Sequence, residues 1–155
     1  MAYVVRVAEG AEDLEACFAV RKEVFVVEQE VPAELEYDAY DARAVHVLAV
    51  GEDGTPLGTG RLLYGADAAG KTGAGPEVGS LGRLAVSAGA RGLGVGAALV
   101  RGIEEAARGA GLTEVDLHAQ THALGFYERL GYVAYGPVFL DAGIEHRGMR
   151  RGLRG

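Results

Sequence analysis

The sequence predicts one domain in which helices pack on a mixed β-sheet, and three observations lead to this fold class. Its 155 residues suffice to bury one hydrophobic core but are few for two ordinary domains. Hydrophobic residues make up 49% and charged residues 24%, as in a folded globular protein. Segments of alternating apolar residues are interleaved with segments of helical period, in the order β-α-β-β-β-α-β-α-β-β. This order predicts an α/β (α+β) architecture.

The N-terminal part of the chain begins with a strand and a helix. Residues 3–8 have the composition of a strand, and residues 11–24 carry apolar side chains such as Leu14 and Phe18 at helical spacing. From there to about residue 42 the chain is acidic, weakly periodic and contains Pro32. We therefore expect a loop with one short helix at most.

A hairpin follows this loop. Residues 44–51 and 56–64 are predicted strands, and the Asp53-Gly54 pair between them is typical of a tight turn. Residues 65–79 are rich in glycine and alanine and have no periodicity. We expect them to form a flexible connection.

The second half alternates strands and helices again. Glycines close both of its helices. The terminal arginines, Arg147, Arg150, Arg151 and Arg154, could reach phosphates of CoA or RNA, and the favoured interpretation is a solvated tail. The expected elements are a strand at 80–86, a helix at 93–109, a strand at 114–119, a helix at 122–130, and strands at 132–139 and 145–151.

Several protein classes are disfavoured by composition. Cys17 is the only cysteine, so an intrachain disulfide is impossible and no zinc-ligand spacing exists; we expect no metal. No stretch approaches the roughly 18 consecutive apolar residues that a membrane span requires. The first residues lack the pattern of a secretion signal. We expect a cytoplasmic protein that does not associate with membranes.

The net charge of −7 is unevenly distributed. Residues 1–53 contain four Lys or Arg against thirteen Asp or Glu, whereas residues 54–155 contain eleven against nine. The acidic part argues against a nucleic-acid partner. It would suit a cationic acceptor, with an anionic ligand on the C-terminal side. Surface charge that only keeps the protein soluble is an equally good explanation.

A glycine-rich turn, Arg91-Gly92-Leu93-Gly94-Val95-Gly96, joins the predicted strand 80–86 to the following helix. The first N–H groups of a helix have no internal partner, and the helix dipole adds positive charge there. Glycines let the backbone approach an anion closely, and Arg91 adds a charged donor. The pattern alone leaves open a dinucleotide, another phosphate ligand, or a turn that binds nothing.

Two longer motifs carry a family resemblance. Gly82-Arg83-Leu84-Ala85-Val86, followed by Arg91 to Leu99, resembles motif A of the GCN5-related N-acetyltransferase (GNAT) superfamily, with Arg91, Gly94 and Gly96 at its defining positions. The segment Ala123-Leu124-Gly125-Phe126-Tyr127-Glu128-Arg129-Leu130-Gly131-Tyr132 resembles motif B. Their order and separation also match those of the superfamily.

A subgroup is suggested by the ends of the chain. The run from Val24 to Pro32 is similar to ElaA-like acetyltransferases, as are Glu36, Asp38, Asp41, His46 and the segment from Gly143 to Met149. Glu145 stands where the subgroup commonly has proline, which leaves the shape of that loop open. The resemblance covers nearly all of residues 1–155, which we interpret as a single domain.

The resemblance implies an acyl-CoA N-acyltransferase fold, with helices flanking a mixed sheet that splays apart between strands 80–86 and 114–119. Acetyl-CoA is the implied cofactor. The backbone of Leu84, Ala85 and Val86 would pair with its pantetheine arm, and one N–H would polarise the thioester carbonyl. The remaining cofactor contacts would come from Arg91, Gly92, Leu93, Gly94, Val95, Gly96, Ala97, Gln120 and Tyr127.

The resemblance also implies the reaction, in which a primary amine attacks the thioester directly. Tyr127 matches the residue that protonates the departing thiolate, although it could equally pack against or hydrogen-bond the cofactor. The subgroup assigns Glu28 and Gln29 to the acceptor wall, with Glu28 as a catalytic residue and Asp38 and His118 as further substrate contacts. Candidates for the proton acceptor, directly or through water, are Glu28, Asp38, Asp41, Glu77, His118 and His146.

Three alternatives remain open from the sequence. The acceptor could be a small molecule or a peptide, and a homodimer is compatible with the resemblance. A catalytically inactive CoA-binding sensor or structural protein would share the same motifs, since a fold does not by itself prove activity. A nucleotide-binding or RNA-binding module would use the glycine turn differently, and the acidic first third argues against it.

Overall fold

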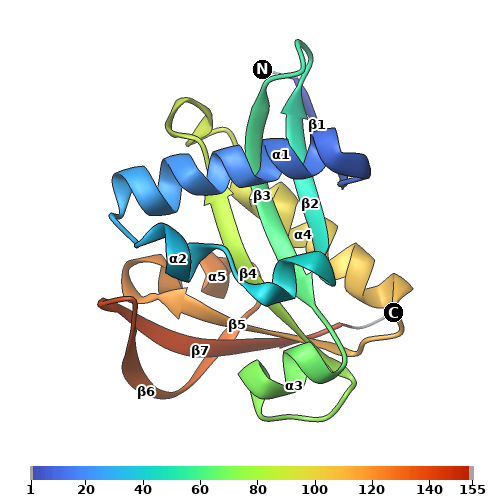
Figure 1. Ribbon diagram of the computed structural model, residues 1–155. Helices are drawn as coiled ribbons and strands as arrows, with labels where there is room; N and C mark the ends of the chain where they lie inside the picture. The colour runs from blue at the N-terminus through green and yellow to red at the C-terminus, as the bar shows by residue number, and fades with distance from the viewer. Residues whose placement is uncertain (1, 154–155) are drawn as a thin grey trace.

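The computed structural model describes residues 2–153, which form a seven-stranded sheet in the order β1-β2-β3-β4-β5-β7-β6 (Figure 1). Neighbouring strands are antiparallel except for β4 and β5, which are parallel. The predicted mixed sheet is therefore confirmed. The strands are β1 (Tyr3–Val7), β2 (Val45–Gly51), β3 (Pro56–Leu63), β4 (Val78–Val86), β5 (Glu114–Gln120), β6 (Val133–Asp141) and β7 (Ile144–Gly152).

Helices cover both faces of this sheet (Figure 1). Helix α1 (Gly10–Arg21) crosses one face, and α4 (Val95–Gly109) packs on the other. The main hydrophobic core lies under α4, where fully buried Leu99 and Ile103 meet apolar side chains of the sheet. The shorter elements are a π-helical segment η1 (Lys22–Glu28), α2 (Ala33–Glu36), α3 (Ala66–Thr72), α5 (Leu124–Arg129) and the 3₁₀ turns Ala39–Ala42, Ala88–Ala90 and Thr121–Ala123. Among residues 2–153 no helix is long and apolar enough to cross a membrane.

Two expectations about helices need correction. The first helix does not stop near residue 24 but continues as η1, where the N–H of Gln29 donates to the carbonyl of Val24, five residues back. Residues 65–79 are not simply a flexible connection, because they contain α3 and the start of β4. Gly65 and Gly73, both with positive φ, flank that helix, so these glycines mark its ends rather than flexibility.

The prediction that the C-terminal arginines form a solvated tail is also wrong. Arg147, Arg150 and Arg151 belong to β7, which lies between β5 and β6 inside the sheet. Arg150 pairs with Asp116, and Arg151 pairs with Glu104, so at least these two hold carboxylates that are fully buried. Arg154 lies outside the described residues.

The sheet opens where its two parallel strands separate. Pairing between β4 and β5 runs from Val78 and Glu114 to Leu81 and Leu117, and no further. Just beyond, Arg83 has a φ of +53° and forms a bulge opposite β3, which bends β4. The predicted splay between strands 80–86 and 114–119 is thus confirmed, and it creates the site described next.

Candidate active site

A cleft of about 900 Å³ occupies the opening between β4 and β5. Its walls include Val95 and Tyr127, which belong to the core on the α4 side of the sheet, and Val24 and Phe25, which pack on the α1 side. The cleft therefore passes through the sheet and is reached from both faces. We call the turn and first helical turn Arg91–Ala97 the glycine end, and the cluster Arg21, Glu36, Asp38, Asp41, Arg61 and Arg83 the arginine end.

The glycine end presents free backbone N–H groups to the cleft. The first N–H that donates to a carbonyl of this turn in α-helical fashion is that of Ala98, to Gly94 at 3.1 Å, so the preceding three have no acceptor within α4. Gly92 and Gly94 have φ of +84° and +80°. A Cβ on Gly92 would meet nothing within 4 Å, and one on Gly94 only Tyr3 Oη at 3.8 Å. The open space in front of these groups suits a phosphate.

Gly96 also has a packing role. A Cβ there would lie 3.2 Å from the ring of Phe126, so the absence of a side chain lets α4 and α5 pack closely. Leu93, predicted as a cofactor contact, is 43% exposed and does not line the cleft. Of the predicted turn contacts, the cleft walls include Arg91, Gly92, Gly94, Val95, Gly96 and Ala97.

Arg91 is held by Glu28, which arrives from the end of η1. The guanidinium donates from Nη1 and Nη2 to the two carboxylate oxygens, at 2.9 and 2.8 Å, and from Nε to the carbonyl of Val86. These hydrogen bonds raise the pKa of Arg91 and lower the pKa of Glu28. Glu28 is therefore a weak base in this state, and a bound phosphate would compete with it for Arg91.

The β5-facing edge of β4 is unpaired beyond Leu81. Leu84, Ala85 and Val86 line the cleft along this edge, while the opposite edge pairs Ala85 with Thr59 of β3. An extended ligand can therefore add to β4 in the way a further strand would.

Tyr127 projects from α5 into the cleft and is 8% exposed. Burial raises the pKa of its hydroxyl, so the group stays protonated at neutral pH and can donate a hydrogen bond. Its ring packs edge-on against Phe126 and Tyr132. Tyr132, by contrast, donates its hydroxyl proton to Glu104 at 2.9 Å and does not line the cleft.

Gln29 and Gln120 meet across the cleft. The Gln120 amide donates to Gln29 Oε1 at 2.9 Å, which joins the end of η1 to the end of β5. His118, two residues earlier on β5, lines the cleft, and its side chain is 31% exposed. Its Nε2 lies 3.8 Å from Asp116 Oδ1, and its ring packs on Phe139.

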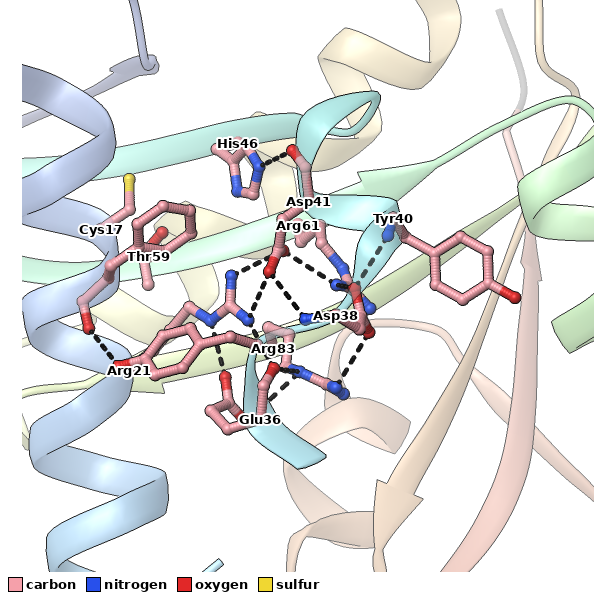
Figure 2. A network of polar contacts seen from close by, with 12 residues as sticks. Cys17, Arg21, Glu36, Asp38, Tyr40, Asp41, His46, Thr59, Arg61 and Arg83 are labelled. Atoms are coloured by element: carbon pink, nitrogen blue, oxygen red, sulfur yellow. Dashed lines mark hydrogen bonds and ion pairs between the residues drawn. The ribbon is translucent and has the colours of Figure 1, made fainter. Parts of the chain in front are cut away.

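The arginine end is a network of buried charges (Figure 2). Arg21, which is fully buried, donates to Glu36 at 2.6 Å and to Asp41 at 2.8 Å. Arg61 Nη1 donates to Asp38 at 2.8 Å and to Asp41 at 2.9 Å. Arg83 completes the network with contacts of 3.3 Å to Glu36 and 3.2 Å to Asp38. The three carboxylates are thus matched by three guanidiniums.

This network changes the interpretation of the acidic segment. Asp38 does not line the cleft; it accepts from Tyr40 N and begins a 3₁₀ turn, which is a structural task. Although burial opposes it, hydrogen bonds from Arg21 and Arg61 lower the pKa of Asp41 to about 2. Burial raises the pKa of Glu36 despite its two arginine partners. These carboxylates are neither a solvated loop nor a free site for a cationic acceptor.

The six proton-acceptor candidates are now separated by position. Glu28, His118 and His146 line the cleft, whereas Asp38, Asp41 and Glu77 do not. His146 Nδ1 is within 2.7 Å of the Ile144 carbonyl, to which it must donate. Within residues 2–153, no group of three or more His, Cys, Asp or Glu side chains is arranged to hold a metal ion.

The sequence interpretation missed the cationic residues of the cleft wall, Arg61, Lys71 and Arg83. Arg61 and Arg83 stand inside apolar strands, where a charge must find a partner to be buried. A charged residue inside an apolar strand, together with the acidic segment that precedes residue 42, could have indicated buried ion pairs at these positions. Lys71 lies in α3, which was not expected to be a helix.

A sheet opened at its parallel pair, with a phosphate-sized glycine turn on one side and a polar pocket on the other, defines a CoA-dependent group-transfer fold. Residues 11–132 match the model of the acetyltransferase (GNAT) family, and the chain belongs to this family. Acyl transfer is therefore its general class of reaction, and acyl-CoA the class of donor. The predicted superfamily is confirmed.

Similar proteins agree with this assignment. The uncharacterized N-acetyltransferase YjcF of Bacillus subtilis is 38% identical over 146 residues, covering 94% of this chain and 96% of that protein. An acyl-CoA N-acyltransferase structure from Pseudomonas aeruginosa is 34% identical with a TM-score of 0.78, covering 97% and 98% of the two chains. Escherichia coli ElaA is 28% identical with a TM-score of 0.79 and the same coverage. The resemblance to ElaA noted from the motifs is confirmed.

Proposed function

We propose that this protein transfers an acetyl group from acetyl-CoA to a primary amine by direct attack. One observation carries the proposal: the cleft passes through the sheet, so a donor bound at the glycine end and an acceptor entering from the α1 face meet between β4 and β5. Acetyl-CoA would supply an activated thioester. Family membership supports acyl transfer in general, whereas the acetyl group and the amine belong to the proposal.

The glycine end would bind the pyrophosphate. Free N–H groups of Val95, Gly96 and Ala97 combine with the dipole of the fifteen-residue α4 to favour an anion. Arg91 would exchange Glu28 for a phosphate. The free edge of β4 at Leu84 to Val86 would orient the thioester, and a backbone N–H there would stabilise negative charge on its oxygen.

Two side chains would move protons. Tyr127 keeps its proton at neutral pH and has no hydrogen-bond partner for its hydroxyl among residues 2–153, so it can donate to the departing thiolate. We assign removal of the amine proton to His118 rather than to Glu28. The imidazole of His118 lies in the cleft wall, whereas Glu28 is neutralised by Arg91.

Direct attack is preferred over an acyl-cysteine intermediate. Cys17 is fully buried, does not line the cleft, and burial raises the pKa of its thiol. A thiol of this kind is a poor nucleophile. In the competing possibility, a CoA-binding protein without activity, Tyr127 would only pack against or hydrogen-bond the cofactor.

The first test compares donors. Acetyl-CoA should raise the melting temperature, whereas ATP and NAD should not, and mixing acetyl-CoA with a panel of primary amines should release free thiol. Faster thiol release from a longer acyl-CoA than from acetyl-CoA would show that the donor carries a different acyl group. Binding of acetyl-CoA without thiol release from any amine in the panel would favour the non-catalytic alternative.

Tyr127→Phe tests the proton donor. We expect turnover to fall roughly 10- to 100-fold, while the dissociation constant for acetyl-CoA is nearly unchanged. The loss is modest because a thiolate leaves more easily than a more basic leaving group and needs less help from a proton donor. Steady-state kinetics and a binding titration measure the two effects separately. Tyr132→Phe is the control: it loses the hydrogen bond to Glu104 and should lower stability without a comparable loss of turnover. Wild-type turnover in Tyr127→Phe would remove this role.

A further inference from the structure

The cleft wall at the arginine end carries one cation, Lys71, that stands outside the network. The three guanidiniums and three carboxylates of the network balance, and Lys71 adds a fourth cation to the cleft wall. Within residues 2–153 no carboxylate lies within ion-pair distance of Lys71; its ammonium rests 5.2 Å from the centre of the Tyr40 ring. Burial lowers the pKa of Lys71, and the charges of Arg83 and Arg61 lower it further.

Two carboxylates hold Arg61 in place, but they accept hydrogen bonds from only one of its three nitrogens. Both of its hydrogen bonds to Asp38 and Asp41 leave from Nη1, and its side chain is 2% exposed. Its buried Nε has no hydrogen-bond partner among the described residues, which is costly for a charged donor. The edge formed by Nε and Nη2 can donate two hydrogen bonds to a planar two-oxygen group. Because protein atoms cover Nε in this state, a carboxylate would reach this edge only after a small movement of the Arg61 side chain.

Open space adjoins this guanidinium. Arg61 pairs with Gly82 across β3 and β4, so their side-chain positions lie on the same face of the sheet. A Cβ built on Gly82 meets nothing within 4 Å. Leu81 of β4 and Leu117 of β5 are the last paired residues before the two strands separate. The next residue on each strand, Gly82 and His118, therefore lies at the mouth of the opening. Arg61, the space over Gly82 and His118 therefore form a row across three strands.

Building on the proposed function, we propose that the acceptor carries a carboxylate as well as its amine. The carboxylate binds Arg61 over Gly82, with Lys71 as a second cation, and the amine lies toward His118 and the thioester. Asp38 and Asp41 act as positioning residues that hold the guanidinium rigid before the acceptor arrives. Asp141 also lines the cleft, and its negative charge acts on Lys71, so the subsite depends mainly on Arg61.

An acceptor that carries a carboxylate accounts for the arrangement of Arg61, the space over Gly82 and His118 better than an acceptor with an amine alone. A polyamine or an alkylamine would bring another positive charge beside Lys71, which has no ion-pair partner among the described residues. A carboxylate instead supplies the acceptor that Arg61 lacks. The acceptor class is thus an amino acid or a similar zwitterion, and the acidic sequence of residues 1–53 does not predict it.

The direct experiment is a calorimetric titration of the protein saturated with CoA. Each common amino acid is compared with its own carboxamide, which keeps the amine and the side chain but removes the negative charge. We expect at least one amino acid to bind about 10- to 100-fold more tightly than its amide. Equal affinities, tighter binding of the amides, or binding of neither would overturn the carboxylate subsite.

A pair of variants locates the subsite without disturbing the buried network. Gly82 is not in the positive-φ region and faces open space, so both Gly82→Asp and Gly82→Asn can be built. Gly82→Asp places a carboxylate directly opposite Arg61, where it should displace the carboxylate of the acceptor and weaken amino-acid binding at least 10-fold more than Gly82→Asn does. Equal losses in the two variants would contradict the assignment to Arg61.

Failure of this inference is distinguishable from failure of the proposed function. If acetyl-CoA binds and thiol is released with amines or amides but not preferentially with amino acids, only the carboxylate subsite is wrong. If acetyl-CoA does not bind, the proposed function itself is wrong. Circular dichroism and the melting temperature of the Gly82 variants verify that both are folded.

Discussion

The two ends of the cleft are built in opposite ways. The glycine end is a continuous segment, Arg91–Ala97, whose binding groups are backbone N–H groups and whose shape depends on φ at Gly92 and Gly94. The arginine end is a set of charged side chains drawn from α1, from the segment around α2, and from β3 and β4. A ligand site made of backbone is encoded locally, whereas a site made of paired charges exists only after folding.

The two ends therefore differ in their coupling to stability. Arg91 and Glu28 are half-exposed, so their ion pair contributes little to folding and can be exchanged for a ligand. Arg21 and Glu36 are almost completely buried, and removing one partner leaves a charge without compensation. We expect mutations at the glycine end to change ligand binding, and mutations at the arginine end to change folding as well.

The largest effect is expected for Arg21→Met. Loss of the guanidinium leaves Glu36 and Asp41 buried with fewer partners, so the free energy of unfolding should fall by about 3–5 kcal/mol. Urea denaturation measures the change. Arg43→Met is the control, since Arg43 pairs with Asp67 at the surface, and it should have little effect. If the two variants were equally stable, the proposed difference in stabilisation between buried and exposed ion pairs would be contradicted.

Gly94→Trp should have the next largest effect, on ligand binding. Gly94 lines the cleft next to the free N–H groups, so a bulky indole there should obstruct a bound phosphate, and we expect acetyl-CoA affinity to fall more than 100-fold, about 2.7 kcal/mol. Gly111→Trp is a matched control because Gly111 has the same φ of +80° and faces open space beyond the end of α4. Both variants bear the same backbone strain. Only the first should lose binding in a titration with acetyl-CoA.

Acid should weaken the arginine end through Asp41. Its pKa is about 2 in the folded protein against an ordinary value of 3.8, so its contribution, about 2 kcal/mol, is complete above pH 4 and lost as the pH falls toward 2. The raised pKa of Glu36 acts in the opposite direction, because its contribution is lost as the pH rises. Urea denaturation from pH 5 to pH 2.5 should show the fall. Asp41→Asn should flatten the profile, and an unchanged slope would contradict the role of Asp41.

The smallest effect is expected for Glu28→Gln. Removing the carboxylate frees Arg91 for a phosphate, so the dissociation constant for acetyl-CoA should decrease a few-fold, and turnover should change little. Glu105→Gln, which breaks an exposed pair with Arg108 on α4, is the control and should leave affinity unchanged. A large loss of turnover in Glu28→Gln would instead restore Glu28 as the proton acceptor.

Much of the framework follows from local sequence. Short apolar segments bounded by turn residues predict the strands, and the central ones, such as β3, are buried on both faces because helices cover both sides of the sheet. Asp53-Gly54 predicts the hairpin turn, and the glycines after Arg91 predict the start of α4. Gly65 and Gly73 were misinterpreted because a glycine at a helix end and a glycine in a flexible linker look the same until Ala68 is seen to be buried.

The glycine end follows from local sequence, since the conformation of residues 91–97 depends mainly on which of them are glycine. The arginine end instead depends on the folded arrangement of distant segments. Arg21, Glu36, Asp41, Arg61 and Arg83 are up to 62 positions apart, and each looks like a surface charge in its own segment. Burial decides their roles, because charges removed from water must find partners, and those partners come from whichever elements the fold brings together.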